Sequence, residues 1–152
     1  MLSVDGPDVT SSATVTASGV GYIPETPLAD GGHTIYLEVK DNFNNLATKT
    51  WSFTVDTTPP IITNLQPPYS STITNSMPTI SANHSDASGI DTSSIVLRID
   101  SIDVTSSAIV SANAVTYTPM VGLSDGFHWV YLEVKDNAGN LATASWSFTV
   151  DA

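Results

Sequence analysis

The chain has 152 residues, of which 41% are hydrophobic and 12% charged, and it contains no cysteine. Fifteen acidic residues against four basic ones give a formal net charge of -11, which repels phosphate groups and argues against nucleic acid as a partner. Without cysteine the chain has no disulfides, no thiolate metal ligands and no thiol nucleophile.

Composition also predicts the fold class. Ser, Thr, Val and Ile are abundant, and nine Gly and nine Pro interrupt the chain, which is typical of short β-strands joined by tight turns. No apolar run approaches the roughly 20 residues that span a bilayer, and the N-terminus lacks a basic segment followed by an apolar one. We therefore expect no membrane insertion of these residues and expect any export signal or anchor to lie outside them.

An internal repeat organises the chain. Residues 97–151 align without a gap over residues 2–56 at a constant offset of 95 residues, and more than half of the aligned positions are identical. This period is the size of one immunoglobulin-like (Ig-like) β-sandwich, so the sequence predicts a tandem repeat of such modules. The matched pairs include Tyr22 and Tyr117, His33 and His128, Tyr36 and Tyr131, Trp51 and Trp146, and Asp56 and Asp151.

The first copy, residues 1–56, is incomplete. It begins at the position of the third strand, C, so we expect strands C to G without strands A and B. One sheet is then largely missing, and its absence leaves an apolar face poorly covered, at a cost of roughly 25 cal/mol per Å² exposed. Three arrangements are open: a truncated half-module, strand donation from another chain, or residues 61–83 folding back onto this half. The apolar face comprises Val15, Tyr22, Ile35, Leu37, Trp51 and Phe53.

The second copy, residues 57–152, is complete. Alternation of polar and apolar residues between Gly- and Pro-rich turns predicts its strands. No segment shows the period of a helix with caps, so we expect no helix. The turn Asp-Asn-Ala-Gly-Asn at residues 136–140 is typical of a hairpin. The predicted strands are 61–65 (A), 79–83 (B), 95–100 (C), 108–112 with 115–118 (D and E), 128–135 (F) and 141–150 (G).

The period of two also predicts which side chains are buried. In the last strand every second residue from Ala142 to Val150 is apolar, and the residues between them are Ser and Thr. In the preceding strand Trp129, Tyr131, Glu133 and Lys135 face outward. The predicted core residues of these two strands are Ala142, Ala144, Trp146, Phe148, Val150, Val130, Leu132 and Val134.

Three motifs carry a family resemblance: Val55-Asp56-Thr57-Thr58-Pro59-Pro60, Asp86-Ala87-Ser88-Gly89-Ile90-Asp91 and Asp136-Asn137-Ala138-Gly139-Asn140. They resemble those of the tandem Ig-like (Big-type) modules of large bacterial and archaeal surface proteins and adhesins. The resemblance implies an extracellular, cell-surface setting, in which neighbouring modules act as extenders and calcium stiffens their junctions. The half-length first copy departs from that pattern.

Acidic residues in the predicted turns suggest where calcium would bind. In this topology the B–C loop, the F–G turn and the start of strand A lie at one end of the module, and calcium prefers such oxygen ligands. The alternative is that Asp, Asn and Gly are simply good turn formers. The predicted ligands are Asp56, Asp86, Asp91, Asp136, Asn137 and Asn140.

A second candidate site is predicted on the outer face of strands C and F. Trp129, Tyr131 and Arg98 are expected to stand together there, where aromatic rings stack on sugars and Arg donates to hydroxyls. The first copy has Thr34 and Ser3 at the positions of Trp129 and Arg98, so this patch is not repeated. The alternatives are a contact between modules and ordinary strand-forming aromatics, which are common on exposed strand faces.

Catalysis is not expected. His33 and His128 follow an Asp-Gly turn and point inward, and the chain carries no nucleophile-elbow, zinc-protease or phosphate-loop motif. We therefore predict a non-catalytic structural or adhesive module of a prokaryotic surface protein. Two alternatives are a carbohydrate-binding or spacer appendage of a secreted polysaccharide-degrading enzyme and a filament subunit that self-associates by strand exchange.

Overall fold

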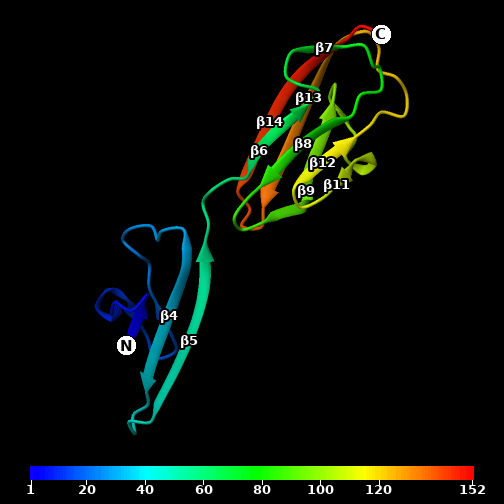
Figure 1. Cartoon of the computed structure of the whole chain (residues 1–152). Helices are drawn as coiled ribbons and strands as arrows, with labels where there is room; N and C mark the ends of the chain where they lie inside the picture. Colours follow the sequence, from blue (N-terminus) through cyan, green and yellow to red (C-terminus); the bar gives the residue numbers. More distant parts are fainter. The chain divides into compact units, whose positions relative to one another are not determined.

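The computed structural model describes all 152 residues, and nearly all of its regular structure is β (Figure 1). The chain forms two compact units, Met1–Asp56 and Thr57–Ala152. Neither of its short helices is long and apolar enough to cross a membrane.

The second unit is a two-layer β-sandwich. One sheet has the strand order β10-β9-β13-β14-β7 and the other β11-β12-β8-β6, which places the equivalents of strands C, F and G in one layer and A, B and E in the other. The predicted all-β, Ig-like fold class is confirmed. The strands are β6 (Ile61–Gln66), β7 (Ser71–Ile73), β8 (Ile80–Ser85), β9 (Ile90–Ile99), β10 (Ile102–Asp103), β11 (Ile109–Val110), β12 (Ala114–Tyr117), β13 (Gly126–Asp136) and β14 (Leu141–Val150).

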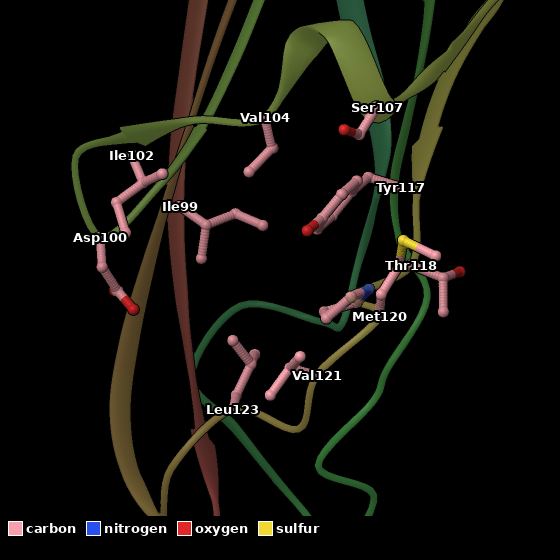
Figure 2. Close-up of a pocket in the computed structure, with 11 residues that line it drawn as sticks. Ile99, Asp100, Ile102, Val104, Ser107, Tyr117, Thr118, Met120, Val121 and Leu123 are labelled. Carbon is pink, nitrogen blue, oxygen red and sulfur yellow. The ribbon is translucent and has the colours of Figure 1, made fainter.

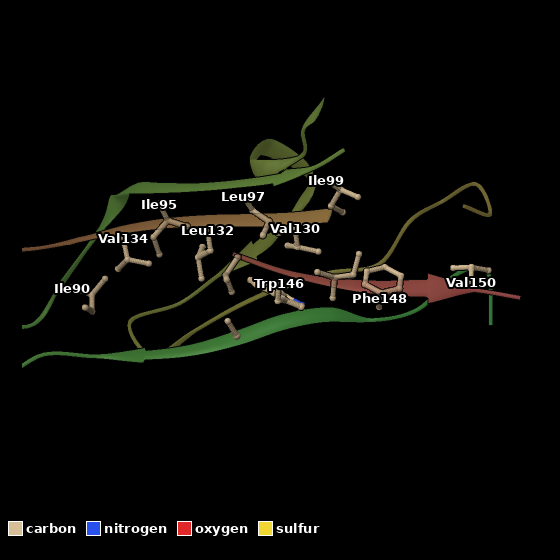
Figure 3. Close-up of a cluster of buried hydrophobic side chains, with 13 residues drawn as sticks. Ile90, Ile95, Leu97, Ile99, Val130, Leu132, Val134, Trp146, Phe148 and Val150 are labelled. Atoms are coloured by element: carbon tan, nitrogen blue, oxygen red, sulfur yellow. The ribbon is translucent and has the colours of Figure 1, made fainter. Parts of the chain in front are cut away.

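The core of this unit lies between the two sheets (Figure 3). Trp146, Phe148 and Val150 of β14 are fully buried, as the alternation predicts, whereas Ala142 and Ala144 are only half-buried near the start of the strand. From the opposite sheet, β8 contributes Ile80 and Ala82. The remaining core residues are Ile90, Ile95, Leu97, Ile99, Val115, Val130, Leu132 and Val134.

Three features of the second unit differ from the prediction. Strand β9 begins at Ile90 rather than at residue 95, and the Pro-flanked β7 was not predicted. The expectation of no helix is also wrong, because a short 3-10 helix, η2 (Thr105–Ser107), follows β10. Asp103 nucleates it by accepting the backbone N–H of Thr105 at 2.9 Å, a local turn interaction without helical periodicity.

The strands of the first unit are counterparts of β9, β11, β12, β13 and β14 only. Its main sheet has the order β1-β4-β5, and β2 and β3 form a separate hairpin. Nothing in it corresponds to β6, β7 or β8. Its elements are β1 (Leu2–Val4), the 3-10 helix η1 (Thr10–Ser12), β2 (Thr14–Val15), β3 (Val20–Gly21), β4 (Gly31–Lys40) and β5 (Leu46–Val55).

The missing strands leave the inner face of this sheet open. Trp51 is 43% exposed while its counterpart Trp146 is 0% exposed, and Phe53 is 41% exposed while Phe148 is 1% exposed. The local sequence Trp-Ser-Phe-Thr-Val-Asp is identical in the two places. The difference in burial therefore comes from what lies opposite the strand, and not from the strand itself.

Candidate functional sites

Two of the predicted acidic ligands come together in the second unit. Asp86 lies in the loop after β8, Asp136 is the last residue of β13, and each offers a carboxylate oxygen within 4.8 Å of the other. The side chain of Asp136 is almost fully enclosed, with the residue 1% exposed.

The carboxylate of Asp136 organises the turn between β13 and β14. One oxygen accepts the backbone N–H groups of Ala138 at 2.9 Å and Asn140 at 2.8 Å, and the other accepts the Asn140 side-chain amide at 2.8 Å. Burial acts to raise the pKa of Asp136, but these hydrogen bonds outweigh it, so the pKa lies below its usual value. The group is therefore ionised at neutral pH, as a cation ligand must be.

The loop after β8 is tied to this turn and to the start of the unit. Asn137 donates its backbone N–H to Gly89 at 3.1 Å and its side-chain amide to Ser88 at 2.9 Å, and Asn140 donates to the carbonyl of Thr58 at 3.4 Å. Gly89 has a φ of +86°, and a Cβ there would lie 2.8 Å from the Asn137 amide, so the close approach requires glycine.

One predicted ligand of the second unit, Asp91, is not part of this arrangement. Asp91 lies on β9, where one carboxylate oxygen accepts the Ser93 backbone N–H at 3.0 Å and its hydroxyl at 2.6 Å; it is not among the carboxylates that converge on Asp136. Asp56 is the last residue of the first unit, and its role as a ligand stays a prediction.

Asp86 and Asp136 offer carboxylate oxygens, which are the type of ligand that calcium prefers. Each carboxylate oxygen has more than one lone pair, so an oxygen that accepts a hydrogen bond can also bind a cation. The turn of the first unit provides a comparison. Asp41 accepts the N–H groups of Phe43 and Asn45 and the Asn45 amide, at 2.8 to 2.9 Å, in the pattern of Asp136, although it is exposed. The hydrogen bonds of Asp136 are thus explained by the turn alone.

The predicted aromatic patch is assembled on the outer face of the β9–β13 pair. Arg98 lies directly opposite Tyr131 in the strand register, and together with Trp129 and Ser101 these residues line an open depression of about 250 Å³. Trp129 is 46% exposed. The Tyr131 hydroxyl donates to Glu133 at 3.1 Å, so the ring of this half-buried residue is held in place.

Both repeat histidines are locked into the same hydrogen-bonding pattern. His128 meets the Asp100 carboxylate through Nδ1 at 2.7 Å and the Ser124 carbonyl through Nε2 at 2.8 Å. His33 meets Asp5 and Ala29 in the same way, at 2.7 Å for both. Because both partners of each ring are acceptors, the imidazole is satisfied fully only when both nitrogens carry protons.

This environment raises the histidine pKa. Burial acts to lower the pKa of His128, but the Ser124 carbonyl and the Asp100 carboxylate outweigh it and raise the pKa. Asp100 also accepts the Trp129 backbone N–H at 2.9 Å from a turn in which its φ is +50°. The pair therefore ties the turn after β9 to β13 and leaves neither ring nitrogen for a substrate.

Comparisons with known proteins bear on this fold. Residues 69–152 match the family described as "Bacterial Ig-like domain". The chain belongs to this bacterial Ig-like family. No curated protein matches the sequence.

Several solved structures are similar to this Ig-like chain. At their low sequence identities, the similarity concerns the fold alone. Dimeric latent PorU from Porphyromonas gingivalis is 21% identical with a TM-score of 0.50, and the match covers 88% of this chain and 15% of PorU. CopC from Methylosinus trichosporium OB3b is 15% identical with a TM-score of 0.47, covering 60% and 93%. The fibronectin(III)-like modules of CbhA from Clostridium thermocellum are 14% identical with a TM-score of 0.44, covering 99% and 94%.

The Ig-like sandwich also carries an apolar pocket that sequence reasoning missed. It has a volume of about 340 Å³ and lies between the β9–β10 turn and the segment after β12 (Figure 2). Ile99, Val104 and Leu123 are among the residues that line it, and Asp100 is its one charged residue. The exposed pair Met120 and Val121 in a predicted loop is the signal that could have indicated it.

The third histidine of the chain, His84 in the Ig-like sandwich, has the opposite electrostatic environment. His84 of β8 is 2% exposed, and desolvation lowers its pKa. It should stay neutral in the folded state under conditions that protonate it in the unfolded chain.

These opposite shifts predict opposite pH dependence of stability. The raised pKa of His128 stabilises the fold fully below the unfolded pKa of about 6.5, and this contribution is lost as the pH rises through the folded pKa. The advantage of the wild type over His128→Gln should therefore be largest below a pH of about 6.5 and should shrink as the pH rises above it. Urea midpoints read from Trp146 fluorescence, with Trp51 and Trp129 replaced by Phe, measure this in the second unit.

His84→Leu serves as the control of opposite sign. Because the His84 pKa is depressed, its contribution destabilises the fold as the pH falls below about 6.5, and its removal should flatten the loss of stability in acid. A pH-independent gap between the wild type and His128→Gln would show that the ion pair with Asp100 contributes nothing.

Proposed function

We propose that the chain is a non-catalytic structural module of an extracellular prokaryotic surface protein, a spacer that bears tension between neighbouring Ig-like modules. Membership of the bacterial Ig-like family supports the class and the surface setting. The occupied ring nitrogens of His33 and His128 support a structural role for the residues that would otherwise be the first candidates for catalysis.

The observation that carries the spacer role is the pairing of β7 with β14. The two strands run parallel, with Ser71, Thr72 and Ile73 opposite Phe148, Thr149 and Val150. Backbone bonds from Ser70 to Ser147 at 2.7 Å and from Asp151 to Ile73 at 2.9 Å extend this pairing at both ends.

Parallel pairing matters for tension because β7 lies near the start of the second unit and β14 at its end. Force applied to the two ends slides the strands along each other, so that their hydrogen bonds are loaded together. In the antiparallel β13–β14 hairpin, in contrast, force applied at the open end breaks the bonds one after another. The second unit is therefore built to resist extension along the chain.

Single-molecule pulling tests the spacer role. Since the chain has no cysteine, engineered pairs give unique attachment points. Thr57→Cys with Ala152→Cys loads the β7–β14 pair in shear and should unfold at a high force. Phe127→Cys with Ala152→Cys opens the β13–β14 hairpin, in which Phe127 pairs with Thr149, and should unfold at a several-fold lower force. Equal forces in the two geometries would contradict the role in bearing tension.

Calcium at the β13–β14 turn is a second element of this proposal. Asp86 and Asp136 would provide the carboxylates, and Asn137, Asn140 and Asp56 are the further predicted ligands. Calcium bound there would neutralise two close carboxylates and would fix the loop after β8 to the turn. A stiff end on each module is what a spacer under tension requires.

Thermal melting tests the calcium site. A ligand that binds only the folded state stabilises it by about 2.7 kcal/mol at a hundred times its Kd, so millimolar calcium should raise the Tm relative to EDTA. Asp86→Asn should abolish the rise, because it removes a ligand without breaking the turn of Asp136, whereas Asp151→Asn, an exposed control in the same unit, should retain it. An equal Tm of the wild type in calcium and in EDTA would remove the site.

Carbohydrate binding is the second candidate function, and the depression lined by Arg98, Trp129 and Tyr131 favours it. A flat aromatic face beside a guanidinium suits the apolar face and the hydroxyls of a sugar ring. The function would belong to a cell-surface adhesin or to an appendage of a secreted polysaccharide-degrading enzyme.

A glycan array followed by titration calorimetry tests this candidate. Trp129→Ala should weaken binding about tenfold or more, which corresponds to roughly 1.4 kcal/mol. Phe127→Ala is the matched control, because Phe127 is exposed on the same strand but does not line the depression. The absence of any glycan signal from the wild-type protein would eliminate the idea.

A further inference from the structure

The first unit contains two hollows where the second unit has its core. One, of about 240 Å³, is lined by Val20, Tyr22, Trp51 and Phe53 among other apolar residues, and the other, of about 460 Å³, lies beside Val15, Val20 and Leu37. The β1-β4-β5 sheet forms one wall and the β2–β3 hairpin the other. The space is therefore an apolar groove between two sheets, open to solvent.

The repeat indicates which kind of segment fills such a groove. Val20, Trp51 and Phe53 correspond to Val115, Trp146 and Phe148, all of which are buried to within 1%. In the second unit the core residues from outside the repeated region, 97–151, are Ile90 and Ile95 of β9 and the apolar residues of a single stretch of chain, 61–85, which includes the sheet opposite β9. The residues of the 61–85 stretch are Ile62 and Leu65 of β6, Ile73 of β7, and Ile80 and Ala82 of β8.

From this correspondence we propose that the groove of the first unit, the acceptor groove, binds a β-strand segment with the pattern of residues 61–85 that lies outside residues 1–152. The backbone is prepared for it on both sides. Strand β3 has only β2 as a neighbour, and β5 lies at the edge of its sheet. Unpaired strand edges of this kind accept an added strand.

The register of the added strand follows from the second unit. There β12 pairs with β8 so that Val115 lies opposite Ala82 and Tyr117 opposite Ile80. The counterparts Val20 and Tyr22 should therefore lie opposite the residues of the donor that match Ala82 and Ile80. The part of the donor that matches β7 should run parallel to β5 beside Phe53, Thr54 and Val55, as β7 does beside β14.

Strand exchange between copies of this chain does not supply the donor. Each chain has two sheets that need covering, at residues 2–56 and 97–151, but only one stretch of the 61–85 type. Any exchange that covers the first unit uncovers a second unit, so the number of open faces stays the same. This count argues against the self-associating filament and points to a donor outside residues 1–152.

Charge is compatible with such a donor. Residues 59–85 contain no Asp, Glu, Lys or Arg, so a segment of this composition brings no charge into the apolar groove. It is also not repelled by the acidic chain, whose formal net charge is -11.

A peptide comprising residues 59–85, added to the isotopically labelled full chain, tests the proposal. The peptide should shift the indole signal of Trp51 and should slow the hydrogen exchange of the Val20 and Tyr22 amides. Trp146 should be unaffected, because the second unit already contains its own segment. A peptide that leaves the Trp51 signal unchanged, or that binds elsewhere, would overturn the proposal.

Two substitutions sharpen the test. A peptide with Ala82→Asp should bind about tenfold or more weakly, since it would bury an unpaired carboxylate; this control leaves the acceptor chain unaltered. In the chain, Val20→Asp should also abolish binding, whereas Thr50→Asp, on the outer face of β5, should not. Equal binding of the two peptides would contradict insertion into the groove.

Light scattering of the chain alone provides the last control. A monomer without peptide, and a one-to-one complex with it, are the expected results. A dimer that buries Trp51 without any peptide would show that a second copy covers the face, and would overturn the proposal.

Discussion

Contact between two apolar sheet faces is the interaction on which this structure depends. A β-sheet with one apolar face gains stability only when that face is covered, because exposed apolar surface costs roughly 25 cal/mol per Å². Trp146 and Trp51 show this within one chain: the same six-residue sequence surrounds both, yet only Trp146 faces a second sheet and is buried. The strands of the first unit keep their pairing, since β4 and β5 retain a continuous register, but they enclose a groove where the second unit has a core.

Polar side chains, in contrast, are used mainly to shape turns and to join strands. Asp136 and Asp41 hold hairpin turns by accepting backbone N–H groups, and His128 with Asp100 joins the turn after β9 to β13. An imidazole whose two ring nitrogens are both occupied in this way has none left for a substrate. This distribution of polar groups agrees with a structural role for a bacterial Ig-like module, and it leaves the exposed face at Trp129 and the Asp86–Asp136 pair as the places where a ligand would add something new.

The two units also show how strand pairing relates to mechanical role. The parallel β7–β14 pair places the first and last parts of the second unit side by side. The first unit has no counterpart of β7, so the corresponding edge of β5 is open. The same edge that would resist tension once it is paired is therefore the edge at which another strand can add.

Much of this protein was determined by its sequence alone. The repeat, the alternation along β13 and β14 and the turn at residues 136–140 predicted the all-β sandwich, the buried Trp146 and the open face of the first unit, because these signals are local or recur at a fixed offset. The sequence did not predict β7, the convergence of Asp86 on Asp136 without Asp91, or the pocket beside Tyr117. Each of these depends on segments that are distant in the chain and meet only when the sheets pack. Local periodicity says which face of a strand is apolar, but only tertiary structure decides what covers it.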